Sequence, residues 1–563
     1  MSLMIGGYRD LLMERQKANK SNLLSFLKAA KSTNIDVESN LSESKGHHHL
    51  SPVESSDLVV SEPTVENSNH GSQMRNMGKL QRAEAWLDRK MGIETQGIDR
   101  IREEDKVPPS VWNMFLLWWS LTCHVGALPM GMLGPEFGLT FYQSASASLI
   151  GAFLGSICTA SCATLGPKLG LRAMATARYS FGFYGAKVCS LLNIIIGAGF
   201  ATVNVVVVGQ LLSAVSEYKL SLSVGCILIG AISYLVSLFG FKIIHTYEKY
   251  AWIFSFLILC ILGGQIGRKV DTSLPSTHSG LANIGAFLSF ATINFSATSA
   301  WGSMAADYLC NYPANTPKWK IYLLTVSGIV TSTFFTVMIG ICLGNIAHHV
   351  TIEPGAKAET YAHPILAEAY QRHGLGGLLS VSYHPVALSK VILIFLTFSV
   401  IGNNVAVNYS SGLSIQLLGD FFHAIPRFIW SFLNGFIITV LAVLGRESLS
   451  VIVANFVSML GYWTISFTLI LAIEDRVIRR RSGYDLDVWD TSSKLPHGMA
   501  AILALLISYL AGGLSGMAQS LYTGPIARKF GGNGGDVGIF LSGAITLVFY
   551  SIARYYEFQT FLR

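Results

Sequence analysis

Charged side chains are scarce in this chain of 563 residues, since Asp, Glu, Lys and Arg together make up only 13% of it. Soluble domains usually contain about 25%. Twelve long apolar windows contain none of the four charged residues. They lie at 107–135, 137–167, 188–216, 220–241, 250–267, 272–306, 321–352, 391–419, 428–445, 448–473, 495–527 and 537–553. At ~1.5 Å of helix per residue, each window can cross most or all of a ~30 Å hydrocarbon core.

These windows predict an all-α polytopic membrane protein, embedded in a lipid bilayer by twelve transmembrane helices. They exclude a soluble enzyme, a nucleic-acid-binding module and a disulfide-stabilised secreted domain. A thirteenth uncharged window, 373–389, is rich in Gly, Ser and His and is predicted as a loop. The sequence does not set an oligomeric state.

Motifs that would supply covalent or metal chemistry are also lacking. None of the eight cysteines forms a CxxC pair, so neither a disulfide nor a metal site is expected. The chain has no phosphate-binding P-loop, and the order of its Ser, His and Asp residues does not indicate a catalytic triad. We therefore expect no enzyme activity, no catalytic residues, no cofactor and no ATP-driven transport by this chain alone.

Lys and Arg gather in the loops after the second, fourth, sixth and tenth windows, whereas the intervening loops are poorer in them. The basic loops carry Lys168, Arg172, Arg178, Lys187, Lys242, Lys249, Lys318, Lys320, Arg476, Arg479, Arg480, Arg481 and Lys494. Because basic loops stay in the cytoplasm, this bias places both termini there, as an even number of spans also does.

The expected organisation follows from these loops and windows. It comprises a largely disordered cytoplasmic tail (1–110), core spans one to eight (111–420), core spans nine and ten (421–475), a cytoplasmic loop (476–494), two peripheral spans (495–556) and a short cytoplasmic tail (557–563).

Two windows contain residues that interrupt helices. In the first, His124, Gly126, Pro129 and Gly131 fall near the middle, and in the sixth, five polar residues precede Gly302. Interruptions in spans one and six, five spans apart, are what an inverted repeat of five plus five helices would produce, with a substrate bound between the unwound segments. The alternative is that small residues only let helices pack closely.

Polar stripes mark three further helix faces. In the third window, Asn193, Gly197, Phe200 and Asn204 are spaced four, three and four residues apart, so they share one face. An aromatic ring one turn from an amide suits a flat heterocycle, because the ring stacks while the amide hydrogen-bonds the edge. Asn294, Thr298 and Trp301 form a similar stripe in the sixth window, where Ser296 is a further polar residue. In the eighth window Asn404 and Asn408 share a face, and Asn403 points ~100° away from Asn404. Hydrogen bonds between helices are the alternative role for each amide.

Ionisable side chains are nearly absent from the windows. His124 lies near the centre of the first span, Asp307 at the cytoplasmic end of the sixth and Glu248 just before the fifth. These three residues are the candidates for carrying a coupling proton. A neutral His124 that hydrogen-bonds a neighbouring helix is the alternative for that residue.

Several motifs, taken in order, resemble the nucleobase-cation-symport-1 family and, within it, the fungal purine-cytosine permeases. The similar stretches are Gly97-Ile-Asp99-Arg100-Ile, Gly166-Pro-Lys-Leu-Gly170, Arg178-Tyr-Ser-Phe-Gly182, Gly240-Phe-Lys-Ile-Ile-His245-Thr-Tyr247-Glu248, and Trp301 followed by Ala305-Ala306-Asp307-Tyr308 and Pro313. The resemblance covers roughly residues 90 to 555.

The resemblance implies a twelve-span transporter with a LeuT-like core of ten helices, which takes up nucleobases with protons across the plasma membrane. It places the substrate between spans one, three, six and eight. The residues that the stripes and the resemblance together nominate for substrate binding are Thr122, His124, Gly126, Phe200, Asn204, Ser296, Trp301, Asn403, Asn404 and Asn408. Phe200 and Trp301 would stack on either side of the base.

The eighth span departs from the family motif Asn-Asn-x-Pro-Asn. Here Ala406 stands at the position of the proline, and Val407 stands at the position of the asparagine that follows it. The asparagine is instead found one residue later, at Asn408. That displacement rotates the amide by ~100° around the helix. Some relatives carry vitamin B6-type pyridines, which this variant site could also suit. Ile401 and Gly402 occupy the positions of the hydroxyl pair of sodium-coupled relatives, which favours H⁺ over Na⁺ as the coupling ion.

The sequence thus predicts a secondary active transporter that takes up purine- or cytosine-type nucleobases with protons by alternating access. Alternatives are a proton symporter of a related heterocycle, such as vitamin B6, allantoin or a nucleoside, and a membrane receptor or transceptor without net transport. A channel is disfavoured, because no rings of charged residues are present.

Overall fold

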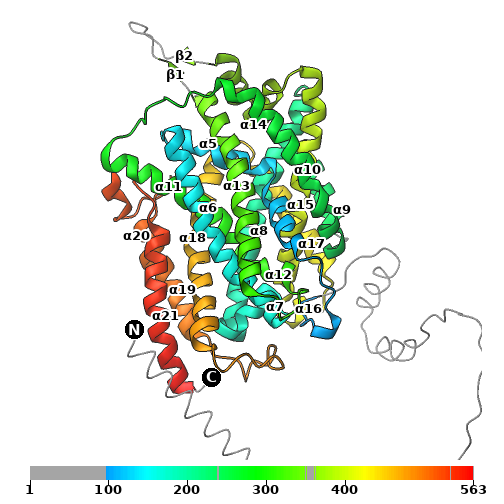
Figure 1. Cartoon of the computed structure of the whole chain (residues 1–563), viewed down its shortest axis with the longest axis vertical. Coiled ribbons are helices and arrows are strands. Elements are labelled where there is room, and N and C mark those ends of the chain that lie inside the picture. The colour runs from blue at the N-terminus through cyan, green and yellow to red at the C-terminus, as the bar shows by residue number, and fades with distance from the viewer. Residues whose placement is uncertain are drawn as a thin grey trace, which may run out of the picture. The chain divides into compact units, whose positions relative to one another are not determined.

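The computed structural model describes residues 97–561 except 238–239, 349, 352–359, 362 and 533, and leaves out the side chains of 240–249, 251, 350–351, 360–361 and 386–387 as well. Most of the expected tail 1–110, the side chain of Glu248 and the end of the C-terminal tail therefore lie outside the described residues. Within the described part, nearly all regular structure is helical (Figure 1).

The helices of the predicted core follow one another in the order of the windows. They are α4 (Trp112–Thr122), α5 (Leu128–Glu136), α6 (Phe141–Ala163), α7 (Leu165–Leu169), α8 (Ala173–Val215), α9 (Leu222–Ser237), α10 (Gly240–Ile266), α11 (Gly280–Ser299), α12 (Ala305–Leu309), α13 (Lys318–His348), α14 (Pro364–Ser382), α15 (Val386–Gln416), α16 (Asp420–His423), α17 (Arg427–Gly445) and α18 (Leu449–Ile473).

The remaining elements are shorter or lie at the C-terminal side. α18 continues as the π-helix η5 (Glu474–Ile478), and α19 (Met499–Ile507), the π-helix η6 (Ser508–Gly513) and α20 (Leu514–Gly516) precede α21 (Gly538–Phe561). Single 3-10 turns are η1 (Glu103–Asp105), η2 (Val125–Ala127), η3 (Gly267–Lys269), η4 (Ala300–Ser303) and η7 (Ala527–Phe530). The two-residue strands β1 (Val350–Thr351) and β2 (Thr360–Tyr361) pair antiparallel.

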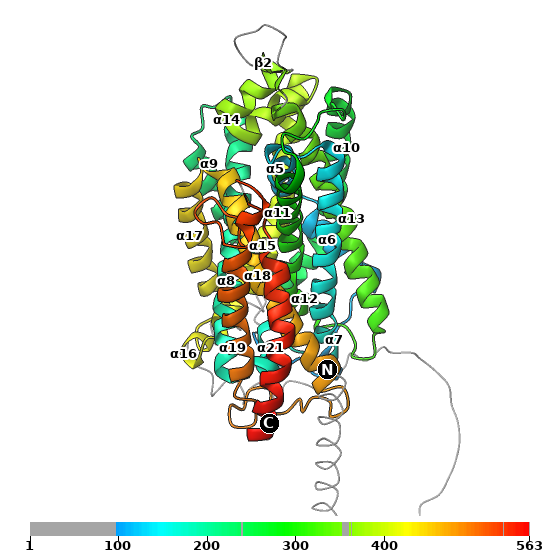
Figure 2. The same cartoon turned by 90° about the vertical axis from the view of Figure 1, so that its left-hand side faces the viewer.

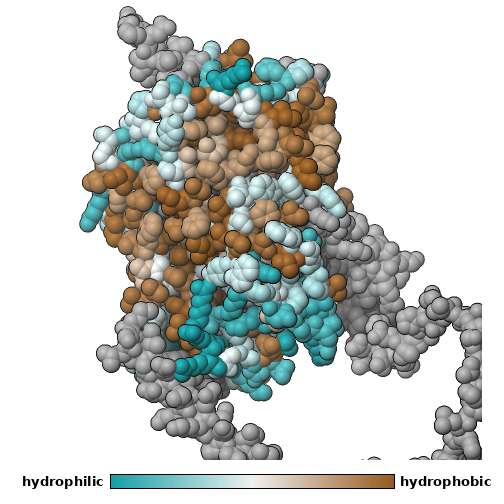
Figure 3. Space-filling model, viewed as in Figure 1, coloured by the Kyte–Doolittle hydropathy of each residue, from teal (hydrophilic) through white to brown (hydrophobic). Residues whose placement is uncertain are grey.

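Ten helices in the described part are long and apolar enough to cross a membrane, and the bent pair of α4 with η2 and α5 makes an eleventh. α9 fills the fourth window but has only 16 residues. The all-α multi-pass fold is therefore confirmed, whereas the number of crossings and the five-plus-five repeat stay predictions. Figure 3 agrees, because hydrophobic side chains cover the middle of the visible face and hydrophilic ones lie toward its ends.

The predicted interruptions in spans one and six are confirmed. α4 ends at Thr122, and the chain bends by 58° before α5. Pro129 stands in the first turn of α5, where its missing N–H costs no helical hydrogen bond. In the sixth span α11 ends at Ser299, η4 follows, and Met304 leaves the helical region with φ −129° before α12 begins.

The predicted loop at 373–389 is wrong over most of its length, because α14 extends to Ser382. Leu375, Leu378 and Leu379 give this helix a buried face. Gly374 kinks it with φ 62°, and the freed N–H of Leu375 donates to Oε1 of Gln210 on α8 at 2.9 Å. The glycines that resembled loop residues therefore permit close contact with α8.

The two ends of the helices differ in chemistry. Buried or half-buried ion pairs join Lys168 to Asp475 at 2.5 Å, Arg178 to Asp490, and both Arg479 and Arg554 to Glu474 at 2.9 and 3.0 Å. We call this end, which includes α7 and α12, the basic end. The opposite end, which includes α14 and the paired strands β1 and β2, is the far end (Figures 1 and 2).

Candidate substrate site

The interruption of the first span is completed by side chains of α15. Because α4 ends at Thr122, the carbonyl of Leu121 and the N–H of Val125 lack helical partners. Nδ2 of Asn403 donates to the Leu121 carbonyl at 2.6 Å, and the N–H of Val125 donates to Oγ of Ser399 at 3.3 Å. Two α15 residues one turn apart therefore stabilise the broken segment.

Three amides meet beside this break. Nδ2 of Asn204 donates to Oδ1 of Asn403 at 2.8 Å and to Oδ1 of Asn404 at 3.0 Å, and Nε2 of His124 lies 3.2 Å from Nδ2 of Asn403. Within the described chain, Asn404 Nδ2 and His124 Nδ1 are buried without a hydrogen-bond partner. The cluster thus keeps polar capacity for a ligand or water.

Gly126 forms the closest backbone approach to this cluster. A Cβ atom there would lie 2.0 Å from Oδ1 of Asn204 and 2.9 Å from Nδ1 of His124. Any larger residue must therefore displace the amide, which explains why the smallest residue stands at this position.

A cavity of about 60 Å³ lies against these groups, between the broken first span, α8, the end of the sixth span and α18. The rings of Phe200 and Trp301 are both part of its wall. Trp301 also packs edge-on against Trp118, with ring centroids 6.1 Å apart, and Phe200 against Phe456 at 6.5 Å. The lining is Thr122, His124, Gly126, Ala127, Met130, Phe200, Val203, Asn204, Ala297, Thr298, Trp301, Thr333, Asn403, Val453 and Val457.

Most of the residues nominated from the sequence meet at this cavity. Thr122, His124, Gly126, Phe200, Asn204, Trp301 and Asn403 line it, and Asn404 lies directly behind as an acceptor for Asn204. Their role in binding stays a prediction, but the structure brings them together from the first, third, sixth and eighth spans.

Ser296 and Asn408 lie elsewhere. Oγ of Ser296 donates to the carbonyl of Ser458 on α18 at 3.3 Å. Asn408 bonds Ser237, the Ser431 carbonyl and Asn434, so the displaced amide of the eighth span joins α15 to α9 and α17. Both residues are absent from the cavity wall, and they serve as contacts between helices.

Sequence reasoning missed several wall residues. Thr333 comes from α13, and its buried Oγ1 has no hydrogen-bond partner among the described residues. Met130, Val203, Val453 and Val457 add apolar surface. The repeated hydroxyls of the seventh window, Ser332 with Thr333, are the signal that could have nominated α13.

Asp307 lies outside the cavity, toward the basic end. Its Oδ1 accepts the N–H of Ala173 at 2.7 Å, and its Oδ2 accepts Oγ of Ser410 at 2.5 Å. Nearby, Asn193 accepts from Ser303 at 2.5 Å and donates to Ser414 at 2.9 Å. These bonds join the end of the sixth span to α8 and α15.

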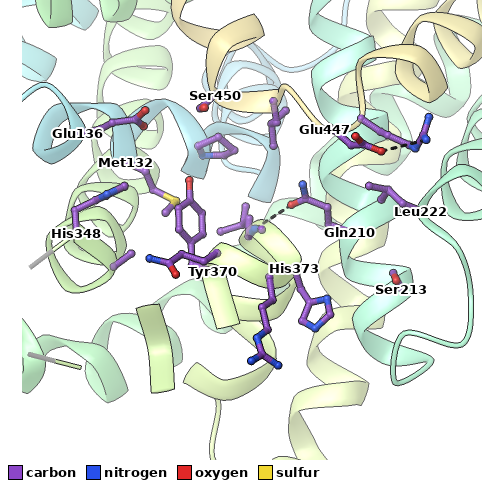
Figure 4. A pocket seen from close by; sticks show the side chains of 18 of the residues that line it. Met132, Glu136, Gln210, Ser213, Leu222, His348, Tyr370, His373, Glu447 and Ser450 are labelled. Atoms are coloured by element: carbon purple, nitrogen blue, oxygen red, sulfur yellow. Dashed lines mark hydrogen bonds and ion pairs between the residues drawn. The ribbon is translucent and has the colours of Figure 1, made fainter. Parts of the chain in front are cut away.

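A larger pocket of about 650 Å³ opens at the far end (Figure 4). Glu136, His348 and Tyr370 reach into it from α5, α13 and α14. Pro129 lines this pocket and the adjacent Met130 lines the smaller cavity, so the first turn of α5 contributes to both walls. We call the larger pocket the vestibule.

The segment before the first span is bound to the basic end. The N–H of Ile101 donates to the carbonyl of Gly170 at 2.8 Å, and Nζ of Lys106 to that of Pro167 at 2.9 Å. A central cavity at two interrupted helices, with a vestibule toward one end, is typical of a broken-helix membrane transporter.

Comparisons with known proteins agree with this class. Residues 103–527 match the family of permeases for cytosine/purines, uracil, thiamine and allantoin. The chain belongs to this family, the nucleobase-cation-symport-1 transporters, and is similar to its fungal purine-cytosine permeases.

The chain is 32% identical to the vitamin B6 transporter TPN1 of Saccharomyces cerevisiae. The aligned region covers 85% of this chain and 90% of that protein. It is 31% identical to the purine-cytosine permease FCY21 of the same yeast (84% and 88% covered) and 30% identical to fcyB of Emericella nidulans (90% and 97%). The fold is shared with Mhp1, a nucleobase-cation-symport-1 transporter whose structure was solved in a closed conformation with bromovinylhydantoin bound. The TM-score is 0.59 at 12% sequence identity, and the match covers 83% of this chain and 96% of that chain.

Proposed function

We propose that this permease is a secondary active transporter that takes up a neutral planar nitrogen heterocycle together with protons, by alternating access. The observation that carries the proposal is the cavity at the broken first span, where two aromatic rings and an amide cluster face one space. Rings stack on the faces of a heterocycle and amides pair with its edge. Because the described wall holds no Asp, Glu, Lys or Arg, recognition rests on neutral groups.

A purine- or cytosine-type nucleobase is the first candidate substrate. Such a base offers N–H donors and ring acceptors along one edge, which match Asn204, Asn403 and His124. Phe200 and Trp301 supply the stacking faces. The similarity to the purine-cytosine permeases FCY21 and fcyB supports the same class.

A vitamin B6-type pyridine is the second candidate, and a specific observation favours it. The second-turn amide of the eighth span is displaced to Asn408, which bonds α9 and α17 instead of facing the cavity. The wall therefore offers fewer amides than the purine-cytosine motif supplies. The 32% identity to a vitamin B6 transporter points in the same direction.

Protons are the proposed coupling ion. Ser399, the hydroxyl nearest to the amides of the eighth span, accepts the N–H of Val125 and so completes the helix break. Ile401 and Gly402 supply no further side-chain oxygen for Na⁺, a cation that requires oxygen ligands. His124 is the proposed proton carrier within the cavity, with Asp307 and Glu248 as the other candidates.

Alternating access fits the distribution of open space. In the described part of the chain the vestibule opens at the far end, whereas the basic end is held by ion pairs and by the segment 97–106. We propose that this arrangement is the outward-facing side of the cycle, that the basic end faces the cytoplasm with both termini, and that the protein works in the plasma membrane.

A competition panel tests the substrate. Cells that express the full chain take up radiolabelled cytosine or pyridoxine in the presence of excess unlabelled cytosine, adenine, hypoxanthine, uracil, allantoin, pyridoxine or thiamine. We expect competition confined to either the nucleobases or the pyridine. Uptake should rise as external pH falls and collapse with a protonophore, whereas dependence on external Na⁺ would overturn the proposed coupling ion.

Counterflow in proteoliposomes separates transport from mere binding. Vesicles preloaded with unlabelled substrate should accumulate labelled substrate transiently and saturably. Binding without such exchange would identify a transceptor, and flux without saturation would identify a channel. Either result would contradict the proposal.

A further inference from the structure

A buried carboxyl group lies outside the substrate cavity, in the segment between the last two spans. Asp536 precedes α21 and is 1% exposed. Its Oδ2 accepts from the Tyr462 hydroxyl and from Nε2 of Gln519 at 2.8 Å, and its Oδ1 accepts the N–H of Gly538 at 3.1 Å. No ion pair joins Asp536 to a Lys or Arg in the described part of the chain. The carboxyl is held by neutral donors alone.

The backbone of the same residue binds the sixth span. The N–H of Asp536 donates to Oγ of Ser289 at 2.9 Å, and its carbonyl accepts from Oγ1 of Thr292 at 3.2 Å. Asp536 therefore joins α11, α18 through Tyr462, and the segment 517–526 through Gln519. We call these contacts the Asp536 clamp.

The clamp connects two walls of the candidate substrate cavity. α11 continues into η4, and this span supplies Ala297, Thr298 and Trp301 to the wall, whereas α18 supplies Val453 and Val457. A change in the strength of the clamp therefore alters how firmly the two walls are held together, without any contact between Asp536 and the substrate.

Water can approach the clamp from the far end. A pocket of about 720 Å³ is lined by Gln519, Ser289 and Gly534, which bond or flank Asp536. This pocket shares Glu136 and Ser450 with the vestibule, so both face the same end. Gln519 both lines this space and donates to the carboxyl of Asp536.

We propose that Asp536 is a proton-binding site, separate from the substrate cavity, that sets the dependence of transport on external pH by loosening the Asp536 clamp. The carboxylate accepts from every donor around it. When a proton from water binds Oδ2, that oxygen becomes a donor, so the Tyr462 hydroxyl can no longer donate to it in the same way. The protonated clamp therefore holds the two walls with one hydrogen bond fewer, and the cavity walls separate more readily at low pH while the carboxyl itself stays buried in both arrangements.

The surroundings place this proton exchange in a useful pH range. Burial raises the pKa of Asp536 to about 7, although the hydrogen bonds from Tyr462, Gly538 and Gln519 act in the opposite direction. The other titratable groups near it are Tyr462 itself and Tyr509, whose ring lies 6.1 Å from that of Tyr462.

Further groups face the adjoining pocket or lie on the neighbouring turn. Glu136 and His278 are part of the pocket wall. Arg528 and Lys529 of η7 are exposed, and α11 presents only the neutral Ser289 and Thr292 to Asp536. No fixed charge among them would hold the carboxyl in one state.

Counterflow at equal internal and external pH tests this inference. The inference rests on the proposed transport function, but the exchange assay needs no proton gradient. Proteoliposomes that contain the full chain exchange the tracer identified by the competition panel, labelled cytosine or pyridoxine, between about pH 5 and pH 8. In the wild type we expect exchange to slow about fivefold toward the alkaline side, as the gain of one hydrogen bond would produce.

Asp536→Asn is the decisive variant, because the amide resembles the protonated carboxyl and its Oδ1 can still accept the N–H of Gly538. We expect it to exchange at the fast acid-side rate at every pH. The matched control is Asp487→Asn, at an exposed position of the basic end, which should keep the wild-type profile. A profile of Asp536→Asn equal to that of the control, or an Asp536→Asn protein that binds substrate but never exchanges, would overturn the inference.

Tyr462→Phe provides an independent measurement if Asp536→Asn fails to fold. Removing the hydroxyl deletes the bond that protonation is proposed to weaken, so exchange should run near the fast acid-side rate and lose most of its dependence on pH. A wild-type pH profile in Tyr462→Phe contradicts the inference. Wild-type exchange that does not depend on pH overturns this inference alone. Absence of any exchange overturns the proposed transport function.

Discussion

Asn204 of α8 donates a hydrogen bond to Oδ1 of Asn403 of α15, with 2.8 Å between nitrogen and oxygen. The second proton of the same amide goes to Asn404 at 3.0 Å, while Asn403 donates to the Leu121 carbonyl at 2.6 Å. The amide cluster therefore links three spans and stabilises the unwound turn that forms the cavity wall. Substrate recognition and the helix break depend on the same side chains.

Asn204→Ala should abolish measurable uptake while the protein still reaches the cell surface. The change leaves the Oδ1 atoms of Asn403 and Asn404 without their donor and removes one edge of the site. Each unpaired group costs about 1–3 kcal/mol, roughly 5–150-fold in affinity. Radiolabelled uptake and surface labelling measure the two effects.

Asn193→Ala is the matched control for that prediction, since Asn193 is a buried amide on the same helix that lies outside the cavity wall. It should lower thermal stability but leave the KM of the remaining uptake unchanged. Equal effects of the two variants on KM would contradict the assignment of Asn204 to the site.

Gly126→Ala should reduce uptake at least tenfold. The added methyl group would lie 2.0 Å from Oδ1 of Asn204, so the amide must move and its bonds to the eighth span must lengthen. Gly263→Ala is the control, because a Cβ at that position meets no atom within 4 Å. Uptake by the first variant at the level of the second would show that the cavity wall tolerates a side chain here.

The interruptions and the third-span stripe could be predicted from sequence because each depends on local chemistry. His124, Gly126 and Pro129 disfavour a continuous helix, and helical periodicity alone puts Phe200 and Asn204 on one face. The fate of Asn408 could not be predicted, because it depends on how α15 is rotated against α9 and α17.

Long-range pairing limited the rest of the prediction. The segment 373–382 resembles a loop until Gln210, far away in the sequence, supplies the acceptor for its kink. Asp536 gave no signal, since a single Asp in a Gly-rich stretch is typical of an exposed turn. Only the approach of Tyr462, 74 residues earlier, makes it a buried group.

Glu474→Gln should lower the free energy of unfolding by about 3–5 kcal/mol, because it removes one partner of a buried ion pair. Glu474 and Arg554 are each 1% exposed in their side chains, and Oε1 of Glu474 also accepts from Arg479 at 2.9 Å. The substitution leaves the Arg554 guanidinium in a buried site with a weaker partner. Thermal unfolding in detergent measures the loss.

Glu368→Gln is the control for the ion pair. Glu368 and Arg372 also form a pair at 2.6 Å, but their side chains are 59% and 70% exposed. An exposed pair one turn apart on a helix contributes about 0.3–0.5 kcal/mol. A loss of similar size in both variants would show that the Glu474 pair contributes no more than a surface contact.

Asp536 should also make the stability of the folded protein depend on pH. Burial raises its pKa from an ordinary value of 3.8 to about 7. Between these values the folded chain holds a proton that the unfolded chain has released, so the free energy of unfolding falls as pH rises through this window and levels off above about pH 7. Asp536→Asn removes this contribution, so its melting temperature should fall less steeply than that of the wild type between about pH 4 and pH 7. Thermal unfolding in detergent at constant ionic strength, with Asp487→Asn as the control, measures the difference in slope. Parallel curves for all three proteins would mean that the Asp536 carboxyl stays ionised throughout this range.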